Sequence, residues 1–276
     1  MKLPIYLDHH ATTPLAQEVL DAMLPYMREH FGNASSREHA FGWRAEEAVE
    51  QARAQVAGLA GVEPREIVFT SGATEANNLA IVGVAEAYAA KGKHIITQAT
   101  EHPAVLDVCR NLEVRGYDIT VLPVTQEGLV TLEDFEGAIR KDTILASVMG
   151  ANNEVGSIQP IQALSEAARD AGVIFHSDMA QLLGRHAVSS ELSAVGLASF
   201  SAHMLYGPKG VGALFVSRRD PRVRLTPQQR GGGHERGLRS GTLNVPGIVG
   251  FGAACALASR QLDEASRRLP ELRDRL

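Results

Sequence analysis

The sequence has few cysteines, no signal-like start and no long hydrophobic run. Its two cysteines, Cys109 and Cys255, are too few for a disulfide framework, so a cytoplasmic location is the default expectation. The first residues, Met1-Lys2-Leu3-Pro4, lack the basic-then-apolar pattern of a secretory signal. The longest apolar runs are far too short to span a bilayer, which argues against a membrane partner.

The chain also lacks a strong excess of either charge. Its formal net charge is −5 over 276 residues, which gives no reason to expect a nucleic-acid partner. No internal repeat or low-complexity segment is present in the sequence. With 45% hydrophobic residues, the chain is long enough to build one large domain with a sizeable core.

The hydrophobic pattern alternates between two periods. Helical periodicity falls at 15–30, 39–59, 74–91, 103–115, 131–139 and 161–171, and short β-rich runs fall near 66–69, 94–98, 118–122, 143–149, 173–177, 196–200 and 212–216. This alternation predicts a three-layer α/β fold, with a mainly parallel seven-stranded sheet between helices. The last stretch, 247–276, also has helical character, and Pro270 is expected to kink or break it.

Two stretches combine a strand with a glycine-containing turn. In the first, Thr70–Ala76, free N–H groups at a helix start favour a phosphate, although a plain capping box has the same pattern. In the second, Ala198–Gly210, Ser201 and His203 close an apolar strand before a Gly-Pro turn. Such strand ends are typical ligand positions in α/β proteins, but an ordinary strand-to-loop junction fits equally.

Several polar residues follow other predicted strands. Asp178 closes an apolar strand, where a carboxylate is costly without a partner, although it also suits the cap of a following helix. His102 and Asn152-Asn153 fit ordinary strand ends and turns. The cluster Asp8-His9-His10 is a poor metal site, because adjacent histidines on an extended chain point to opposite sides. We therefore expect no metal centre.

Taken together, six motifs resemble those of the cysteine desulfurases, a branch of the class V, fold-type I enzymes that use pyridoxal 5′-phosphate (PLP). The resemblance covers essentially the whole chain, and the motifs occur in the family's order. They are Thr70-Ser71-Gly72-Ala73-Thr74-Glu75, Glu101-His102, Asn152-Asn153-Glu154-Val155-Gly156, His176-Ser177-Asp178-Met179-Ala180-Gln181, Ser199-Phe200-Ser201-Ala202-His203 and Arg239-Ser240-Gly241-Thr242.

The resemblance implies a role for each matching residue. His102 is expected to stack on the cofactor ring and to shuttle protons, and Asn153 is expected to reach the ring oxygen and the substrate. Asp178 would pair with the ring nitrogen, and Gln181 with the ring hydroxyl. The residues expected to bind the cofactor phosphate are Ala73, Thr74, Ser201 and His203, with Thr242 completing the phosphate site of the other subunit in a homodimer.

The sequence departs from the family at one position. Where the family has the Schiff-base lysine, this chain has Met204, which has no amine. PLP is therefore expected to bind without a covalent bond. Lys209 is not a replacement, because the family has a lysine at that position as well as the catalytic one.

The resemblance also implies a division of the chain and an activity. Residues 1–15 would be an N-terminal arm, 16–250 the PLP-binding large domain, and 251–276 the start of a linker helix, with the small domain largely missing. In the family, the region beyond carries the sulfur-accepting cysteine and an arginine that binds the substrate carboxylate. Cys109 and Cys255 fall in predicted helices, which indicates packed thiols.

The implied reaction converts L-cysteine to L-alanine and passes the sulfur to an acceptor protein for iron–sulfur cluster assembly or thiolation. We expect this reaction to be impaired in the chain as written. Three alternatives stay open at this point: a non-catalytic PLP-binding or dimerising pseudoenzyme, a lysine-independent PLP enzyme, and a relative of the selenocysteine lyases.

Overall fold

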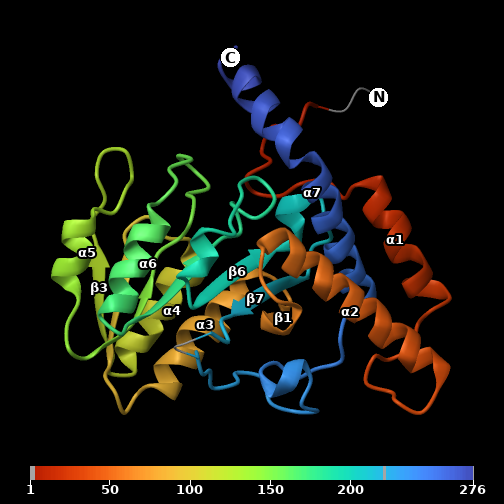
Figure 1. Cartoon of the computed structure of the whole chain (residues 1–276), viewed down its shortest axis with the longest axis horizontal. Coiled ribbons are helices and arrows are strands. Elements are labelled where there is room, and N and C mark those ends of the chain that lie inside the picture. The colour runs from red at the N-terminus through yellow and green to blue at the C-terminus, as the bar shows by residue number, and fades with distance from the viewer. Residues whose placement is uncertain (1–3, 220–221, 276) are drawn as a thin grey trace.

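A computed structural model describes residues 4–219 and 222–275 of the chain (Figure 1). Residues 1–3 of the expected arm and residue 276 of the expected linker helix lie outside this description. The helices are α1 (Gln17–Arg28), α2 (Ala40–Ala60), α3 (Ala73–Ala87), α4 (Pro103–Val114), α5 (Leu132–Ala138), α6 (Ile161–Asp170) and α7 (Val245–Arg273). The strands are β1 (Ile67–Thr70), β2 (His94–Gln98), β3 (Asp118–Leu122), β4 (Thr143–Ser147), β5 (Ile174–Asp178), β6 (Leu197–Ser201) and β7 (Gly212–Val216).

The strands form one seven-stranded sheet in the order β1-β7-β6-β5-β4-β2-β3. The neighbouring pairs from β6 to β3 are all parallel, and only β7 runs antiparallel to both of its neighbours. The predicted mainly parallel, seven-stranded sheet is therefore confirmed.

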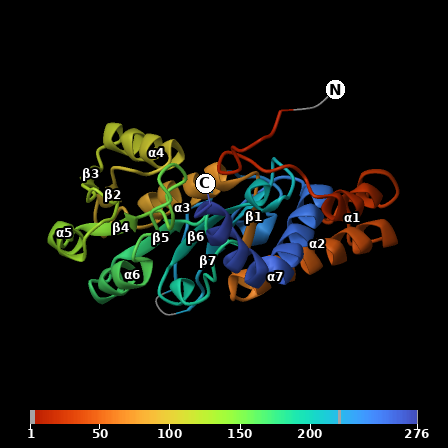
Figure 2. The same cartoon turned by 90° about the horizontal axis from the view of Figure 1, so that it is seen from above.

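The sheet is buried on both faces, as the near-continuous apolar strands require. Along β7, Ala213 and Phe215 pack into one core with α1, α2, α5, α6 and α7. Leu214 and Val216 point to the opposite face and pack with α3 and α4. Viewed from above, the helices lie on either side of the sheet (Figure 2). This arrangement is the predicted three-layer fold.

Local sequence signals set several helix ends. Pro103 begins α4, where its missing N–H costs nothing, and Gly61 ends α2 with a φ of 71° that favours glycine. The expected break at Pro270 is absent, because α7 continues through it to Arg273. The residues around Pro270 are exposed, so the carbonyl that loses its N–H partner there remains open to water.

The expected boundary at 250/251 falls inside α7, which is one helix across it. The division into arm, large domain and linker helix stays a prediction. Among the described residues, no helix has both the length and the apolar character to cross a membrane.

Candidate functional site

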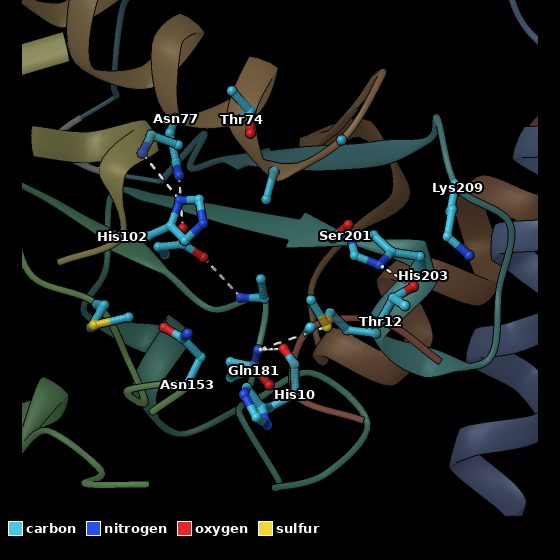
Figure 3. A pocket seen from close by; sticks show the side chains of 18 of the residues that line it. His10, Thr12, Thr74, Asn77, His102, Asn153, Gln181, Ser201, His203 and Lys209 are labelled. Carbon is cyan, nitrogen blue, oxygen red and sulfur yellow. Dashed lines mark hydrogen bonds between the residues drawn. The ribbon is translucent and has the colours of Figure 1, made fainter. Parts of the chain in front are cut away.

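A cavity of about 760 Å³ lies where several strands of the sheet reach their carboxyl ends (Figure 3). Parallel strands bring their ends to one edge, which is why residues far apart in sequence meet there. Nine of the ten residues predicted for the site line this cavity: Ala73, Thr74, His102, Asn153, Asp178, Gln181, Ser201, His203 and Met204. The tenth, Thr242, is exposed and does not line it.

The N-terminus of α3 forms one end of the cavity. Gly72 precedes the helix with a φ of 151°, and no side chain caps the first turn. A Cβ at Gly72 would meet nothing within 4 Å, so the backbone here faces open space. Ala73 and Thr74 begin the helix and line the cavity, so the positive end of the helix dipole lies at the cavity and favours an anion there.

Asp178 is the buried anion of the cavity, with 6% of its surface exposed. Its Oδ2 accepts a hydrogen bond from Asn77 Nδ2 at 2.7 Å, and its Oδ1 accepts one from the backbone N–H of Ala180 at 3.0 Å. Both donors are neutral, so these bonds orient the carboxylate without compensating its charge. A cationic ring nitrogen is a partner that such a carboxylate favours.

A second carboxyl group, Glu101, is buried beside Asp178. Its Oε1 accepts from the backbone N–H of Met149, and its Oε2 has no hydrogen-bond partner among the described residues. Burial, together with the negative charge of Asp178, raises the pKa of Glu101 to about 8. Glu101 is therefore predominantly protonated at neutral pH.

His102 is exposed at the start of α4, and one of its nitrogens is already engaged. Its Nδ1 accepts from the backbone N–H of Ala104 at 3.1 Å and so caps the helix. A neutral His102 must then carry its proton on Nε2. Of the two consecutive asparagines, Asn152 closes a local turn, since its Oδ1 accepts from Glu154 N and Val155 N. Asn153 is the one that lines the cavity.

Gln181 and Met204 lie together at another wall of the cavity. Gln181 Nε2 is 3.7 Å from Met204 Sδ and donates to the carbonyl oxygen of His10 at 2.8 Å. Its Oε1 accepts from the guanidinium of Arg185. Both ends of the amide are thus engaged within the protein, and the second N–H of Nε2 faces only the thioether, a weak acceptor.

Ser201 and His203 line the cavity at the end of β6, with Lys209 beyond them on the side away from His102 and Asn77 (Figure 3). His203 Nδ1 is 3.0 Å from Thr12 Oγ1. Partial burial, and to a smaller extent the charge of Lys209, lower the pKa of His203. His203 is therefore biased toward its neutral form, in which only one of its two ring nitrogens carries a proton.

Thr242 lies on a loop that is firmly attached to the sheet. Glu235, in the same loop, forms a buried ion pair with Arg53 and also accepts from the backbone N–H of Phe69 at 2.7 Å. Arg239 pairs with Glu75. These contacts fix the loop to the sheet, and Thr242 does not line this chain's own cavity.

Sequence reasoning missed Asn77 and Arg185. Asn77 has 0% of its surface exposed, and an asparagine within the apolar run of α3 was a signal that could have been followed. Arg185 donates to the carbonyl oxygens of His9 at 3.1 Å and Met204 at 3.2 Å. Nothing local to its sequence indicates that contact. Within the described residues, no group of three or more His, Cys, Asp or Glu side chains is placed to hold a metal ion.

The thiols of the two cysteines are buried and are poor nucleophiles. Cys109 on α4 and Cys255 on α7 are buried at 2% and 0% exposure. Burial raises the pKa of Cys109 to about 12, with smaller contributions from Glu101 and Glu113, and burial also raises the pKa of Cys255. Both thiols are therefore protonated at neutral pH, and neither is placed to react.

The residues that line the cavity fit PLP on three structural grounds. The uncapped start of α3 suits a phosphate, and the neutral donors of Asp178 leave its charge for a cationic ring nitrogen. His102, whose Nε2 is not used by the helix cap, lines the same cavity. The one feature that does not fit a covalently held cofactor is the thioether of Met204.

Comparisons with known proteins agree with this fit. The aminotransferase class-V family matches residues 5–276. The chain is 56% identical over 276 residues to cysteine desulfurase IscS of Anaeromyxobacter sp. (strain Fw109-5), an alignment that covers 100% of this chain and 68% of that protein. A solved NifS-like protein has a TM-score of 0.94 and 41% identity, covering 99% of this chain and 74% of that one.

A second solved structure, of SspA in complex with cysteine, has a TM-score of 0.88 and 39% identity, covering 97% of this chain and 78% of that one. PLP is the cofactor of the proteins in this family. The sequence and the fold agree over nearly the whole length of this protein. The chain therefore belongs to the class-V aminotransferase family, in the cysteine desulfurase branch.

Proposed function

We propose that this chain holds PLP reversibly, without a covalent bond, in a cavity of the cysteine desulfurase type. The observation that carries the proposal is that Met204 lines the same cavity as Asp178, Ala73 and Thr74. The determinants of non-covalent binding are thus present together, while the residue at the lysine position has no amine.

The bound cofactor supplies an electron sink for reactions at the α-carbon of an amino acid. The chain's own residues prepare the site for it. Asp178, oriented by Asn77 and Ala180, holds a cationic ring nitrogen in place. His102 carries its proton on Nε2, because Nδ1 is held by the helix cap. Its Nε2–H is therefore the group that can donate a proton at the cavity wall.

We propose L-cysteine as the amino acid substrate of this site. Support comes from the cysteine desulfurase relatives and from the solved structure of SspA, which is a complex with cysteine. Sulfur transfer to an acceptor protein for iron–sulfur cluster assembly or thiolation would be the ancestral activity. It is impaired here, because no amine stands at position 204 and both cysteines are buried.

We also propose a homodimer in which Thr242 contributes to the phosphate site of the second copy. The exposure of Thr242 outside this chain's own cavity supports that arrangement. The loop around it is rigidly anchored through Glu235 and Arg53, as a residue that serves another subunit needs to be.

Equilibrium dialysis with PLP tests the proposed function. The unmodified protein should acquire the absorbance of the free aldehyde and lose it again on dialysis. Asp178→Asn should weaken binding by about tenfold or more, because the ring cation loses its anionic partner. Asp263→Asn, which changes an exposed acid on α7, is the matched control and should bind PLP as tightly as the unmodified chain.

Two results contradict this function. Borohydride reduction that fixes the cofactor to Lys209 would mean that another lysine replaces the missing one. Robust release of sulfide from L-cysteine by the purified chain, with contaminating enzyme excluded, would mean that the reaction is intact.

A further inference from the structure

A carboxylate faces the end of the cavity that is proposed to receive the phosphate. Glu75 lies in the first turn of α3, directly after Ala73 and Thr74, and it lines the same cavity. A bare carboxylate at this place would repel a dianionic phosphate, and the proposed ligand would be opposed by the chain itself. The charge of Glu75 therefore needs compensation from within the protein.

Arg239 supplies that compensation from a distant segment. Its Nε donates to Glu75 Oε1 at 2.7 Å, and its Nη2 donates to Oε2 at 3.3 Å. The side chains of Arg239 and Glu75 are only 19% and 15% exposed, so solvent screens this pair less than it screens a surface pair. Arg239 does not line the cavity and makes its contact from the loop that carries Thr242.

The pair also fixes the charge state and the direction of Glu75. Although partial burial opposes it, the hydrogen bonds from Arg239 and Ser71 lower the pKa of Glu75. Glu75 Oε2 accepts from the backbone N–H of Ser71 at 2.7 Å, which ties the carboxylate to the turn before α3. Glu75 is thus an oriented anion at neutral pH whose charge is matched by one guanidinium.

We propose that Arg239 is a positioning residue for the cofactor phosphate, acting through Glu75, whose charge it neutralises so that the start of α3 accepts a dianion. This inference rests on the proposed function, since it takes the phosphate to bind at Ala73 and Thr74. It gives the partly buried pair of Arg239 and Glu75 a ligand-selective role. Without Arg239, the cavity should discriminate against phosphorylated ligands.

Ligand pairs that differ only in the phosphate test this role. Pyridoxine 5′-phosphate and pyridoxine have no aldehyde, so they cannot react with surface lysines, and calorimetry measures their equilibrium binding directly. Arg239→Gln should weaken pyridoxine 5′-phosphate by about tenfold and leave pyridoxine within about twofold. Arg239→Lys, which keeps the charge, should retain most of the affinity for the phosphorylated ligand.

A second substitution, at Glu75, distinguishes this role of Arg239 from a purely structural one, because it should restore the lost affinity. Glu75→Gln alone should not weaken pyridoxine 5′-phosphate, and the double variant should recover affinity to within about threefold of the unmodified chain. Arg115→Gln is the matched control, because Arg115 forms a 2.7 Å pair with Glu86 away from the cavity. That variant should bind both ligands normally.

The outcomes distinguish the two proposals. If the unmodified chain does not prefer the phosphorylated ligand, the proposed phosphate site fails, and the role of Arg239 fails with it. If it has that preference and Arg239→Gln keeps it, only the inference about Arg239 is overturned. Equal weakening of both ligands, or loss that Glu75→Gln does not rescue, would also overturn it, because either would indicate general disruption of the loop.

Discussion

Burial shifts the pKa values of His176 and Glu101 in opposite directions. His176 in β5 lies 2.8 Å from Ser147 Oγ and 3.0 Å from Ser199 Oγ, and burial lowers its pKa to about 3. Glu101 has its pKa raised. The unfolded chain binds more protons than the folded one at His176, so this residue costs stability as the pH falls from about 6.5 toward 3.

Glu101 has the opposite pH dependence, and the substitution Glu101→Gln isolates it. Its pKa of about 8 lies above the unfolded value of 4.5, so its favourable contribution is present below pH 4.5 and is lost as the pH rises through 8. As the pH rises from 5 to 9, the free energy of unfolding of Glu101→Gln should therefore increase relative to that of the unmodified chain, by about 1–3 kcal/mol. Urea denaturation of the cofactor-free protein across this range measures the difference.

A control variant shows whether the pH-dependent change in stability is caused by the burial of Glu101. Glu47 is an exposed acid on α2, so Glu47→Gln should change stability by a nearly constant amount over the same pH range. A Glu101→Gln profile parallel to that of the unmodified chain would contradict the protonated state of Glu101.

At the residue scale, the sequence was informative where a family motif supplied the residue. Asp178, His102 and Thr74 were selected by motif, and they line one cavity. The role of Asn77 depends on a contact with Asp178, which lies 101 residues away. A hydrogen bond across that separation depends on the packing of α3 against the sheet, which no local pattern specifies.

At the scale of elements, the buried hydroxyl of Thr13 is one of several contacts that hold the N-terminal arm to the cavity. Thr13 is 2% exposed, and its Oγ1 donates to the carbonyl oxygen of His203 at 2.7 Å while accepting from the backbone N–H of Tyr206 at 2.8 Å. Tyr206 has a φ of 58°, a left-handed conformation that a tyrosine rarely adopts. The threonine thus stabilises the turn after β6 as well as the arm.

Replacement of this hydroxyl by a methyl group should loosen both segments. Thr13→Val leaves the N–H of Tyr206 without its acceptor, and we expect it to lower the free energy of unfolding by about 1–2 kcal/mol. Thr13→Ser keeps the hydroxyl and should lose clearly less. Denaturant titration of the two variants measures the difference, and equal losses would mean that the hydroxyl contributes no more than the methyl group does.

The element pattern was predictable for a physical reason. Strands such as β4 and β7 are buried on both faces, so they are short continuous apolar runs between turns. The helix does not break at Pro270, because the effect of a proline depends on its position in the helix. Pro270 lies three residues before the end of α7, in the exposed last part of that helix, where a lost hydrogen bond is replaced by water.

At the scale of the whole molecule, loops after several strands meet at one edge of the sheet and form one cavity. The order β1-β7-β6-β5-β4-β2-β3 places the ends of β5 and β6 side by side, which brings Asp178 and Ser201 to the same cavity. The topology thus explains why motifs spread from Thr74 to His203 act at one place. Met204, which stands where the family's lysine is expected, lies in the same cavity.

The most direct test of this account is to restore the missing amine. Met204→Lys, loaded with PLP and reduced with borohydride, should carry the cofactor covalently at position 204 by peptide mass spectrometry, while the unmodified chain should carry none there. The variant should still release little sulfide from L-cysteine, because Cys109 and Cys255 are buried. Failure of Met204→Lys to acquire any covalent cofactor, in a folded protein, would contradict the claim that the site lacks only its lysine.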